Sequence, residues 1–214
     1  PLESQAGISN ELTSFDGEPI FNDLEVLQHW EQTVEKSGDA RTATFFNLIP
    51  LHDGNRMVGS SKVADYKPRA QKLFDQLDTF LTQLEKSNRK IMVVVVPEHG
   101  AALVGDKMQM SGLRDIPSPS ITHVPVGIKF IGMKAPQPTE IVVDQPSSYL
   151  ALSELVARSV DGKLFTEASV NWQDLLKGLP QTAPVSENDN AIVIQYQGKP
   201  YIRLNGGDWV PYPQ

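Results

Sequence analysis

Residues 90–100 read KIMVVVVPEHG. The six apolar residues 91–96 are typical of a strand that is buried on both faces of a parallel sheet. A proline ends this run, and Glu98, His99 and Gly100 follow at once. Ligands of open α/β sheets bind beyond the carboxyl ends of the strands. The stretch therefore predicts an α/β fold with polar site residues at this strand end.

The residues before this strand predict two helices and another strand. Apolar residues recur every three or four positions over 23–36 and again over 65–88, which predicts two amphipathic helices. Between them, residues 42–51 read TATFFNLIPL, a β-branched and aromatic run that predicts a strand covered on both faces. Strand, helix and the strand at 90–96 would form a βαβ crossover.

The residues after the strand predict a long loop and further short elements. Residues 101–122 contain glycine, methionine and proline without a period, and so long a loop in a compact domain is more often functional than idle. We expect strands over 124–131 and 140–143, and a helix over 147–160.

The two ends of the chain have a different character. Residues 1–21 lack apolar spacing and predict an irregular lead-in. Alternating apolar and polar residues predict a β-hairpin over 191–204, with a third strand through Trp209 and a linker over 179–190. We therefore expect three parts: the lead-in 1–21, an α/β domain over 22–180 and a C-terminal β appendage over 181–214.

The composition excludes several classes of function. The chain has 214 residues, 40% of them apolar and 21% charged, as in a globular protein. Its 26 acidic and 19 basic residues give a net charge of −7, which argues against a nucleic-acid partner. No cysteine is present, so any metal would be held by histidine and carboxylates. The longest apolar run is too short to cross a bilayer.

A carboxylate beside an imidazole after a buried strand indicates a metal site. Glu98 and His99 are a costly way to end such a strand unless a cation neutralises the carboxylate. Zinc needs three or four ligands, and these two supply only part of the set. His52 follows the expected strand 42–51 and would face the same crevice, as a third ligand or a phosphate contact. A lone histidine after a strand is, however, more often an ordinary loop residue.

Two further residues are candidates for binding a phosphoryl group. Arg114 lies in the long loop, and its guanidinium presents a fork of donors that suits phosphate oxygens, although a solvated loop charge is the alternative. His123 precedes the strand at 124–131, and it adjoins the crevice if that strand is antiparallel to the others. No Walker loop, dinucleotide glycine motif or Gly-X-Ser-X-Gly turn is present, so the sequence identifies no nucleophile.

The order of the motifs resembles that of a known superfamily. LHDG at 51–54, PEHG at 97–100 and THVPV at 122–126 succeed one another as in the C-terminal half of an alkaline-phosphatase-like domain of the sulfatase superfamily. That superfamily closes its metal strand with Asp-His-Gly, where this chain has Glu-His-Gly. With this departure, the chain is most similar to the bacterial cellulose phosphoethanolamine transferases. The resemblance runs from FDGE at 15–18 to the tail.

The resemblance implies a fold, a reaction and residue roles. The fold would be the C-terminal portion of an alkaline-phosphatase-like three-layer sandwich. The enzyme would use zinc, lie at the periplasmic face of the bacterial inner membrane and work with the cellulose synthase complex. It would move phosphoethanolamine from phosphatidylethanolamine to cellulose. Glu98 and His99 would bind zinc, His52 would be catalytic and would contact the phosphoryl group with Arg114, and His123 would bind substrate.

Families of this kind carry their nucleophile and a further zinc ligand in an N-terminal part. Because this chain lacks that part, begins with Pro1 and shows no signal segment, we expect a cleaved or truncated fragment that is inactive by itself. The alternatives are a metal-dependent phosphatase or sulfatase-type hydrolase of the same fold, and a non-catalytic carbohydrate-binding module.

Overall fold

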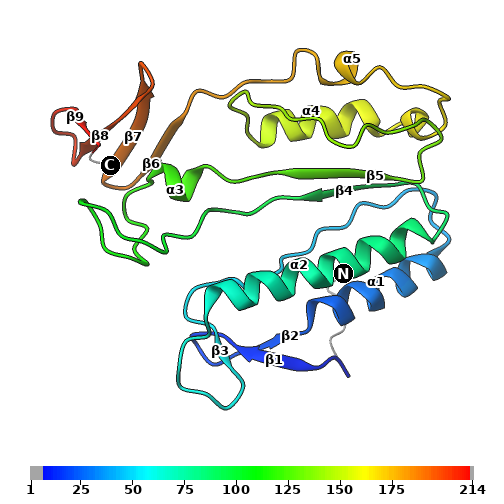
Figure 1. The fold of residues 1–214 in the computed structure, drawn as a ribbon, viewed down its shortest axis with the longest axis horizontal. Coiled ribbons are helices and arrows are strands. Elements are labelled where there is room, and N and C mark those ends of the chain that lie inside the picture. The colour runs from blue at the N-terminus through cyan, green and yellow to red at the C-terminus, as the bar shows by residue number, and fades with distance from the viewer. Residues whose placement is uncertain (1–6, 213–214) are drawn as a thin grey trace. The chain divides into compact units, whose positions relative to one another are not determined.

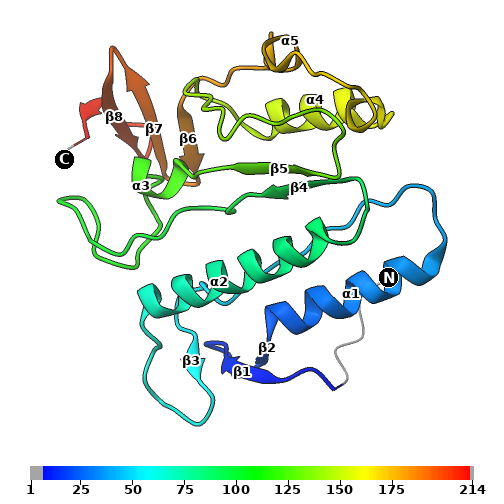
Figure 2. The same ribbon diagram turned by 45° about the vertical axis from the view of Figure 1, so that its right-hand side comes forward.

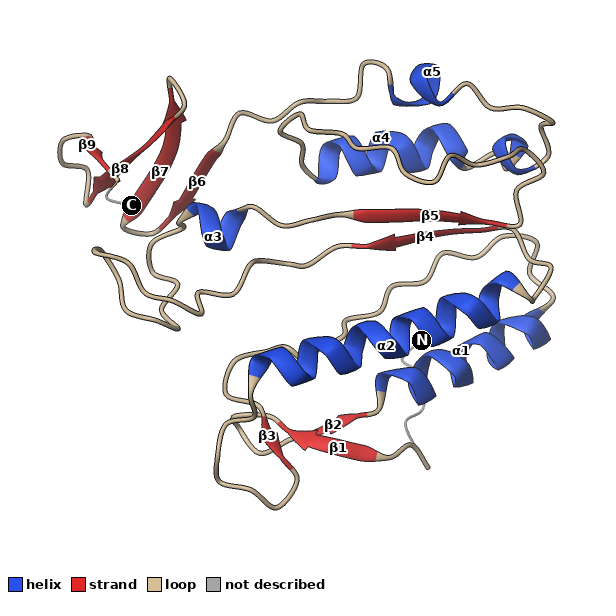
Figure 3. Cartoon of the chain, in the orientation of Figure 1, coloured by secondary structure: helices blue, strands red, loops and turns tan. Residues whose placement is uncertain are grey.

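The computed structural model describes residues 7–212 (Figures 1 and 3). It combines helices with small antiparallel sheets, which confirms the predicted α/β class; the three-layer sandwich stays a prediction. The chain divides between Asn88 and Arg89 into two compact units, each of which is described by itself. None of the helices in the described part of the chain is long and apolar enough to cross a membrane.

The first unit joins a small sheet to two long helices. Its elements are β1 (Asn10–Thr13), β2 (Pro19–Phe21), α1 (Asp23–Ser37), β3 (Arg56–Met57) and α2 (Tyr66–Glu85). The strands pair antiparallel in the order β2-β1-β3. The two helices pack against each other, as the apolar periodicity predicted, and Leu27, Phe80 and Leu84 are buried. Burial of these stripes, rather than helix propensity, supplies most of the stability of such helices.

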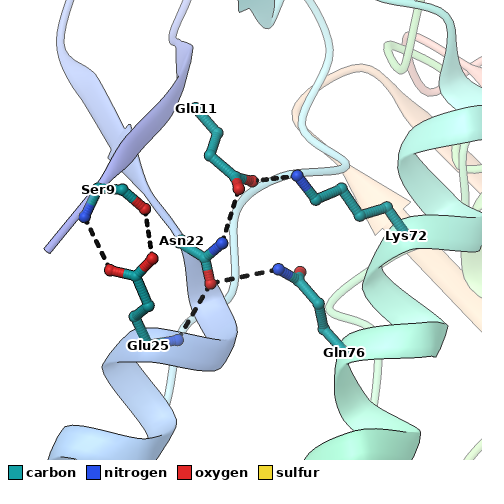
Figure 4. A network of polar contacts seen from close by, with 6 residues as sticks. All are labelled: Ser9, Glu11, Asn22, Glu25, Lys72 and Gln76. Carbon is teal, nitrogen blue, oxygen red and sulfur yellow. Dashed lines mark hydrogen bonds and ion pairs between the residues drawn. The ribbon is translucent and has the colours of Figure 1, made fainter.

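A polar network ties the start of α1 to the sheet and to α2 (Figure 4). Asn22 caps α1 by accepting from the backbone N–H of Glu25 at 3.0 Å, and its amide donates to Glu11 of β1 at 2.6 Å. From α2, Gln76 donates to the side-chain oxygen of Asn22 at 3.2 Å, and Lys72 pairs with Glu11. One cap residue thus links three elements of the unit.

Asp23 follows this cap and is only 9% exposed. Burial raises the pKa of its carboxyl to about 6; the Glu11 carboxylate adds to the rise and Lys72 opposes it. The ionised carboxylate therefore costs stability above pH 6, and this cost is relieved as the pH falls towards 4 because the folded chain takes up a proton first. We expect Asp23→Asn to raise the free energy of unfolding by about 2 kcal/mol at pH 7 and by little at pH 4.

Denaturant unfolding of the wild type and the variant at pH 4 and pH 7 measures this difference. Asp39→Asn is the matched control, because Asp39 is exposed in the turn after α1. Equal effects of Asp23→Asn at both pH values would contradict the expectation.

The second unit is built around a pair of strands covered by helices. Its elements are β4 (Ile91–Val95), α3 (Pro119–Thr122), β5 (Gly127–Ile131), α4 (Tyr149–Ser159), a 3₁₀ helix (Lys163–Phe165), α5 (Trp172–Leu176), β6 (Val185–Asn188), β7 (Ala191–Tyr196), β8 (Lys199–Leu204) and β9 (Val210–Pro211). β4 and β5 pair antiparallel over five residues each, and α4 lies beside them in both ribbon views (Figures 1 and 2). Phe130 of β5 packs with Leu164 and Phe165 in the buried core of this region.

The last four strands form a separate antiparallel sheet in the order β6-β7-β8-β9. Its β7–β8 hairpin was predicted from the alternating pattern, and the register pairs Val193 with Ile202. The core on this face also contains Ile116 and Tyr212, so the sheet packs against the loop that precedes α3. The predicted boundaries at residues 21 and 180 stay predictions.

The strand predicted over 42–51 is wrong, and with it the βαβ crossover. This segment has no regular secondary structure before a turn at Pro50 and Leu51. Instead Phe46 packs edge-on against Trp30 of α1 with ring centroids 5.2 Å apart. β-branched and aromatic residues suit a pleated surface, but a strand also needs a partner, and no strand in the described part of the chain pairs with this segment.

Three further expectations of secondary structure are wrong. Residues 140–143 form no strand, and the expected linker contains β6. The expected irregular lead-in contains β1 and β2 within its described residues, 7–21; residues 1–6 lie outside the described part. Strands of three or four residues carry too little pattern to be recognised, because their pairing partners decide whether they form.

Candidate metal and phosphate site

The candidate site begins at the turn that follows β4. The backbone N–H of Gly100 donates to the carbonyl of Ile121 in α3 at 2.6 Å. A Cβ atom on Gly100 would lie 2.0 Å from the carbonyl oxygen of Ser120, far inside van der Waals contact. The Glu-His-Gly motif thus needs glycine because its backbone touches the backbone of α3, and this contact positions His99.

His99 and Arg114 are brought together although 15 residues separate them. The Nδ1 atom of His99 lies 2.8 Å from the carbonyl oxygen of Gly100, and Nε2 meets the Nη1 of Arg114. A guanidinium can only donate, so Nε2 must be the acceptor and Nδ1 carries the proton. The imidazole therefore presents the Nε2 lone pair, the form in which histidine binds a metal.

The loop that carries Arg114 is held by side-chain hydrogen bonds. Gln109 is buried and bonds Ile116 twice, donating to its carbonyl at 2.8 Å and accepting from its N–H at 3.1 Å. Asn188 of β6 donates to the carbonyl of Asp115, the neighbour of Arg114. These contacts give an otherwise unpatterned loop a defined course.

A carboxylate and a phenol connect the same loop to the end of the chain. The hydroxyl of Tyr212 donates to Asp106 at 2.5 Å, and the other oxygen of Asp106 accepts from the N–H groups of Met108 and Gln109. Burial alone would raise the pKa of Asp106, but these donors lower it overall. Burial and the hydrogen bond to Asp106 raise the pKa of Tyr212 above its usual range. The Asp106 carboxylate thus stays ionised and the Tyr212 phenol stays neutral.

His123 lies at the same end of the strand pair as the Glu-His-Gly turn. It is exposed and forms the C-cap of α3, with its N–H donating to the carbonyl of Pro119 at 2.9 Å. β5 runs antiparallel to β4, and Val95 pairs with Gly127, so the start of β5 adjoins the end of β4. His123 was expected to adjoin the crevice if its strand ran antiparallel, and the strand does so. Its role in binding substrate stays a prediction.

His52 belongs to the first unit, so its sharing of a crevice with His99 stays a prediction. Its exposed ring stacks on Phe15 with centroids 5.8 Å apart and planes at 18°. The Nδ1 atom lies 2.9 Å from the carbonyl oxygen of Asp53. With that atom as donor to the carbonyl, Nε2 carries the lone pair that proton transfer needs.

Arg69 organises the His52 turn, and the sequence analysis missed it. Its guanidinium is buried and donates to the carbonyls of Pro50, His52 and Ala64, the last two at 3.0 and 3.2 Å. Burial lowers the pKa of Arg69, and the nearby Asp53 carboxylate opposes this. A signal was available: Arg69 precedes Leu73 by four positions, so it continues the buried stripe of α2.

The donors present fit part of a zinc site. His99 offers the Nε2 lone pair, and the adjacent carboxylate of Glu98 is exposed. Within residues 7–212, no three histidine or acidic side chains gather where they could hold a metal ion. A complete zinc site needs at least one more ligand. Glu98 and His99 could supply two ligands at most, and their role as zinc ligands stays a prediction.

Residues 1–209 match the family described as "Cellulose biosynthesis protein BcsG C-terminal domain", and the chain belongs to that family. It is 71% identical over 204 residues to "Cellulose biosynthesis protein BcsG" of Salmonella typhimurium (strain LT2), covering 95% of this chain and 36% of that protein. It is 65% identical over 214 residues to the protein of the same description from Escherichia coli (strain K12), covering 100% of this chain and 38% of that protein. The chain thus spans little more than a third of the length of these relatives.

Proposed function

We propose that this chain is the C-terminal part of a zinc-dependent phosphoethanolamine transferase that acts on cellulose. Two relatives described as cellulose biosynthesis proteins support the link to cellulose. The observation that carries the chemistry is the contact between His99 and Arg114, which puts a metal-binding lone pair beside a phosphate-binding guanidinium. The phosphoryl donor would be phosphatidylethanolamine, and the acceptor a glucose hydroxyl of cellulose.

Glu98 and His99 would hold zinc together with ligands from outside residues 1–214. Bound there, zinc would lower the pKa of a nucleophilic hydroxyl and stabilise negative charge on the phosphoryl group. The Nδ1–H of His99, held by the Gly100 carbonyl, would keep the Nε2 lone pair available to bind the metal. Arg114 would then release the His99 imidazole and donate two parallel hydrogen bonds to phosphoryl oxygens instead.

Proton transfer would fall to Nε2 of His52. In the first step a nucleophile outside this chain takes the phosphoethanolamine group, and protonated His52 donates its proton to the oxygen that leaves with the lipid. In the second step the neutral imidazole accepts the proton of the incoming sugar hydroxyl, which attacks the phosphoethanolamine-enzyme. His52 is then protonated again, ready for the next cycle. The bond of Nδ1 to the Asp53 carbonyl would orient the ring throughout.

The reaction would take place at the periplasmic face of the inner membrane, next to the cellulose synthase complex. Both substrates meet there, because the donor is a membrane lipid and the acceptor is the polymer being exported. A membrane anchor would belong to the part of the protein outside this chain.

A transfer assay tests this proposal. A protein that contains this chain and matches the full length of the relatives is incubated with phosphatidylethanolamine vesicles and cellohexaose. We expect phosphoethanolamine-cellohexaose by mass spectrometry, no product after zinc is removed with a chelator, and recovery when zinc is restored. Release of free phosphoethanolamine at the same rate without cellohexaose would favour the hydrolase. An unchanged rate of product formation after zinc removal would refute the zinc-dependent mechanism.

A further inference from the structure

The outer face of the C-terminal sheet carries exposed aromatic side chains. Val193 and Ile202 point into the core, so the alternate residues of β7 and β8 point outward. Among these, Tyr196 and Tyr201 meet edge to face with ring centroids 6.2 Å apart. Tyr196 is 57% exposed. Strands β7 and β8 lie side by side in Figure 2.

Arg203 connects these aromatics to a depression near the other end of the hairpin. It is directly paired with Ile192, and its guanidinium carbon lies 5.2 Å from the ring centroid of Trp209. Trp209 is 41% exposed. In the described part of the chain, the Nε atom of Arg203 is buried and has no hydrogen-bond partner. A buried donor without a partner is costly unless a ligand or water completes it.

The depression has a volume of about 680 Å³ and is widely open to solvent. Its polar lining comes from Glu187, Asn188, Asp189, Asn190, Arg203 and Asn205. The amides both donate and accept, the carboxylates accept, and the guanidinium donates. Such a set matches hydroxyl groups, which also donate and accept. The carboxylates of Glu187 and Asp189 disfavour a phosphate or an anionic lipid at the same place.

Aromatic rings beside a hydroxyl-binding depression fit one class of ligand. The flat face of a pyranose ring presents C–H groups, which pack on tyrosine and tryptophan, while its rim presents hydroxyls. β7 has six residues and extends over roughly 20 Å, room for more than one sugar ring. We propose that this face, from Tyr196 to the depression beside Arg203, binds a neutral β-linked glucan. The identity of the glucan rests on the proposed function, for which this surface would hold the acceptor chain.

Calorimetric titration of the full-length protein with cellohexaose, without lipid donor, tests the surface independently of the reaction. We expect Trp209→Ala and Tyr196→Ala each to weaken cellohexaose binding about tenfold, and Tyr149→Ala to leave it unchanged. Tyr149 is the matched control because it is 60% exposed on another element, α4. Circular dichroism verifies that the variants are folded. In the transfer assay, the first two changes should raise the KM for cellohexaose and preserve the rate at saturating acceptor.

Binding that both variants retain at the wild-type level would overturn the proposal. So would binding of anionic phospholipid vesicles that depends on Trp209 and Tyr196, since the surface would then serve a membrane. If the variants lose cellohexaose binding while the wild type transfers nothing, the glucan surface stands and the proposed reaction fails.

Discussion

Replacement of His99 by alanine is expected to abolish zinc binding and to lower phosphoethanolamine transfer about 100- to 1000-fold in the full-length protein. The reason is that Nε2 of His99 lies against Arg114, and the Gly100 carbonyl fixes the tautomer whose Nε2 lone pair can bind a metal. Metal analysis by mass spectrometry gives the zinc content, and the cellohexaose assay gives the rate.

Two further variants separate ligation from charge at this site. Glu98→Gln keeps the size of the side chain but removes the carboxylate, and we expect it to lower zinc content as well. Glu140→Gln is the matched control, since Glu140 is an exposed carboxylate in a loop of the same unit. If the His99→Ala variant retains its full zinc content and full activity, the hypothesis that the Glu-His-Gly motif binds a catalytic zinc is wrong.

The second large effect is expected from Gly100→Ala. The new Cβ would lie 2.0 Å from the carbonyl oxygen of Ser120, so the turn and α3 must move apart and the bond from Gly100 to Ile121 is lost. Overpacking and the lost hydrogen bond together suggest a decrease of about 2–4 kcal/mol in the free energy of unfolding. Because His99 moves with the turn, zinc content and transfer should fall as well.

Gly127→Ala provides the comparison for Gly100→Ala. Gly127 lies at the same end of the strand pair, its φ is not positive, and a Cβ there would meet nothing within 4 Å. We expect its effect on stability to stay below about 0.5 kcal/mol. Denaturant unfolding of both variants of the 214-residue chain measures the difference. Similar midpoints for the two alanine variants would contradict the close backbone contact.

Local patterns predicted α1, α2, α4 and the β7–β8 hairpin, because their signals lie within the elements themselves, but they missed the short helices α3 and α5. α1 has its cap at Asn22 and a left-handed residue at Gly38, and both ends can be recognised in the sequence. The segment 42–51 was misjudged for the opposite reason. Its composition favours a strand, but pairing decides, and Trp30 provides a helix surface on which Phe46 packs instead.

The site shows the same division between local and distant determinants. Glu98 and His99 could be recognised because an apolar run precedes them in the sequence, although the strand it forms, β4, is only half-buried. The role of Gly100 depends on α3, about twenty residues further along, and the contact of Arg114 with His99 spans a loop without any period. Such contacts arise only once the chain is folded, so a single sequence offers candidates for the site but not their arrangement.

The last strands of the chain also bear on what a lesion far from the motif would do. Ile116 shares a core with Val193, Ile202 and Tyr212, and Asp106 accepts a hydrogen bond from the hydroxyl of Tyr212. A premature stop codon within β8 would leave every candidate metal ligand and Arg114 encoded. It would, however, remove Tyr212 and part of the sheet against which the Arg114 loop packs. Loss-of-function alleles in the codons of β8 and β9 would then mimic active-site alleles, and a genetic screen would score them together.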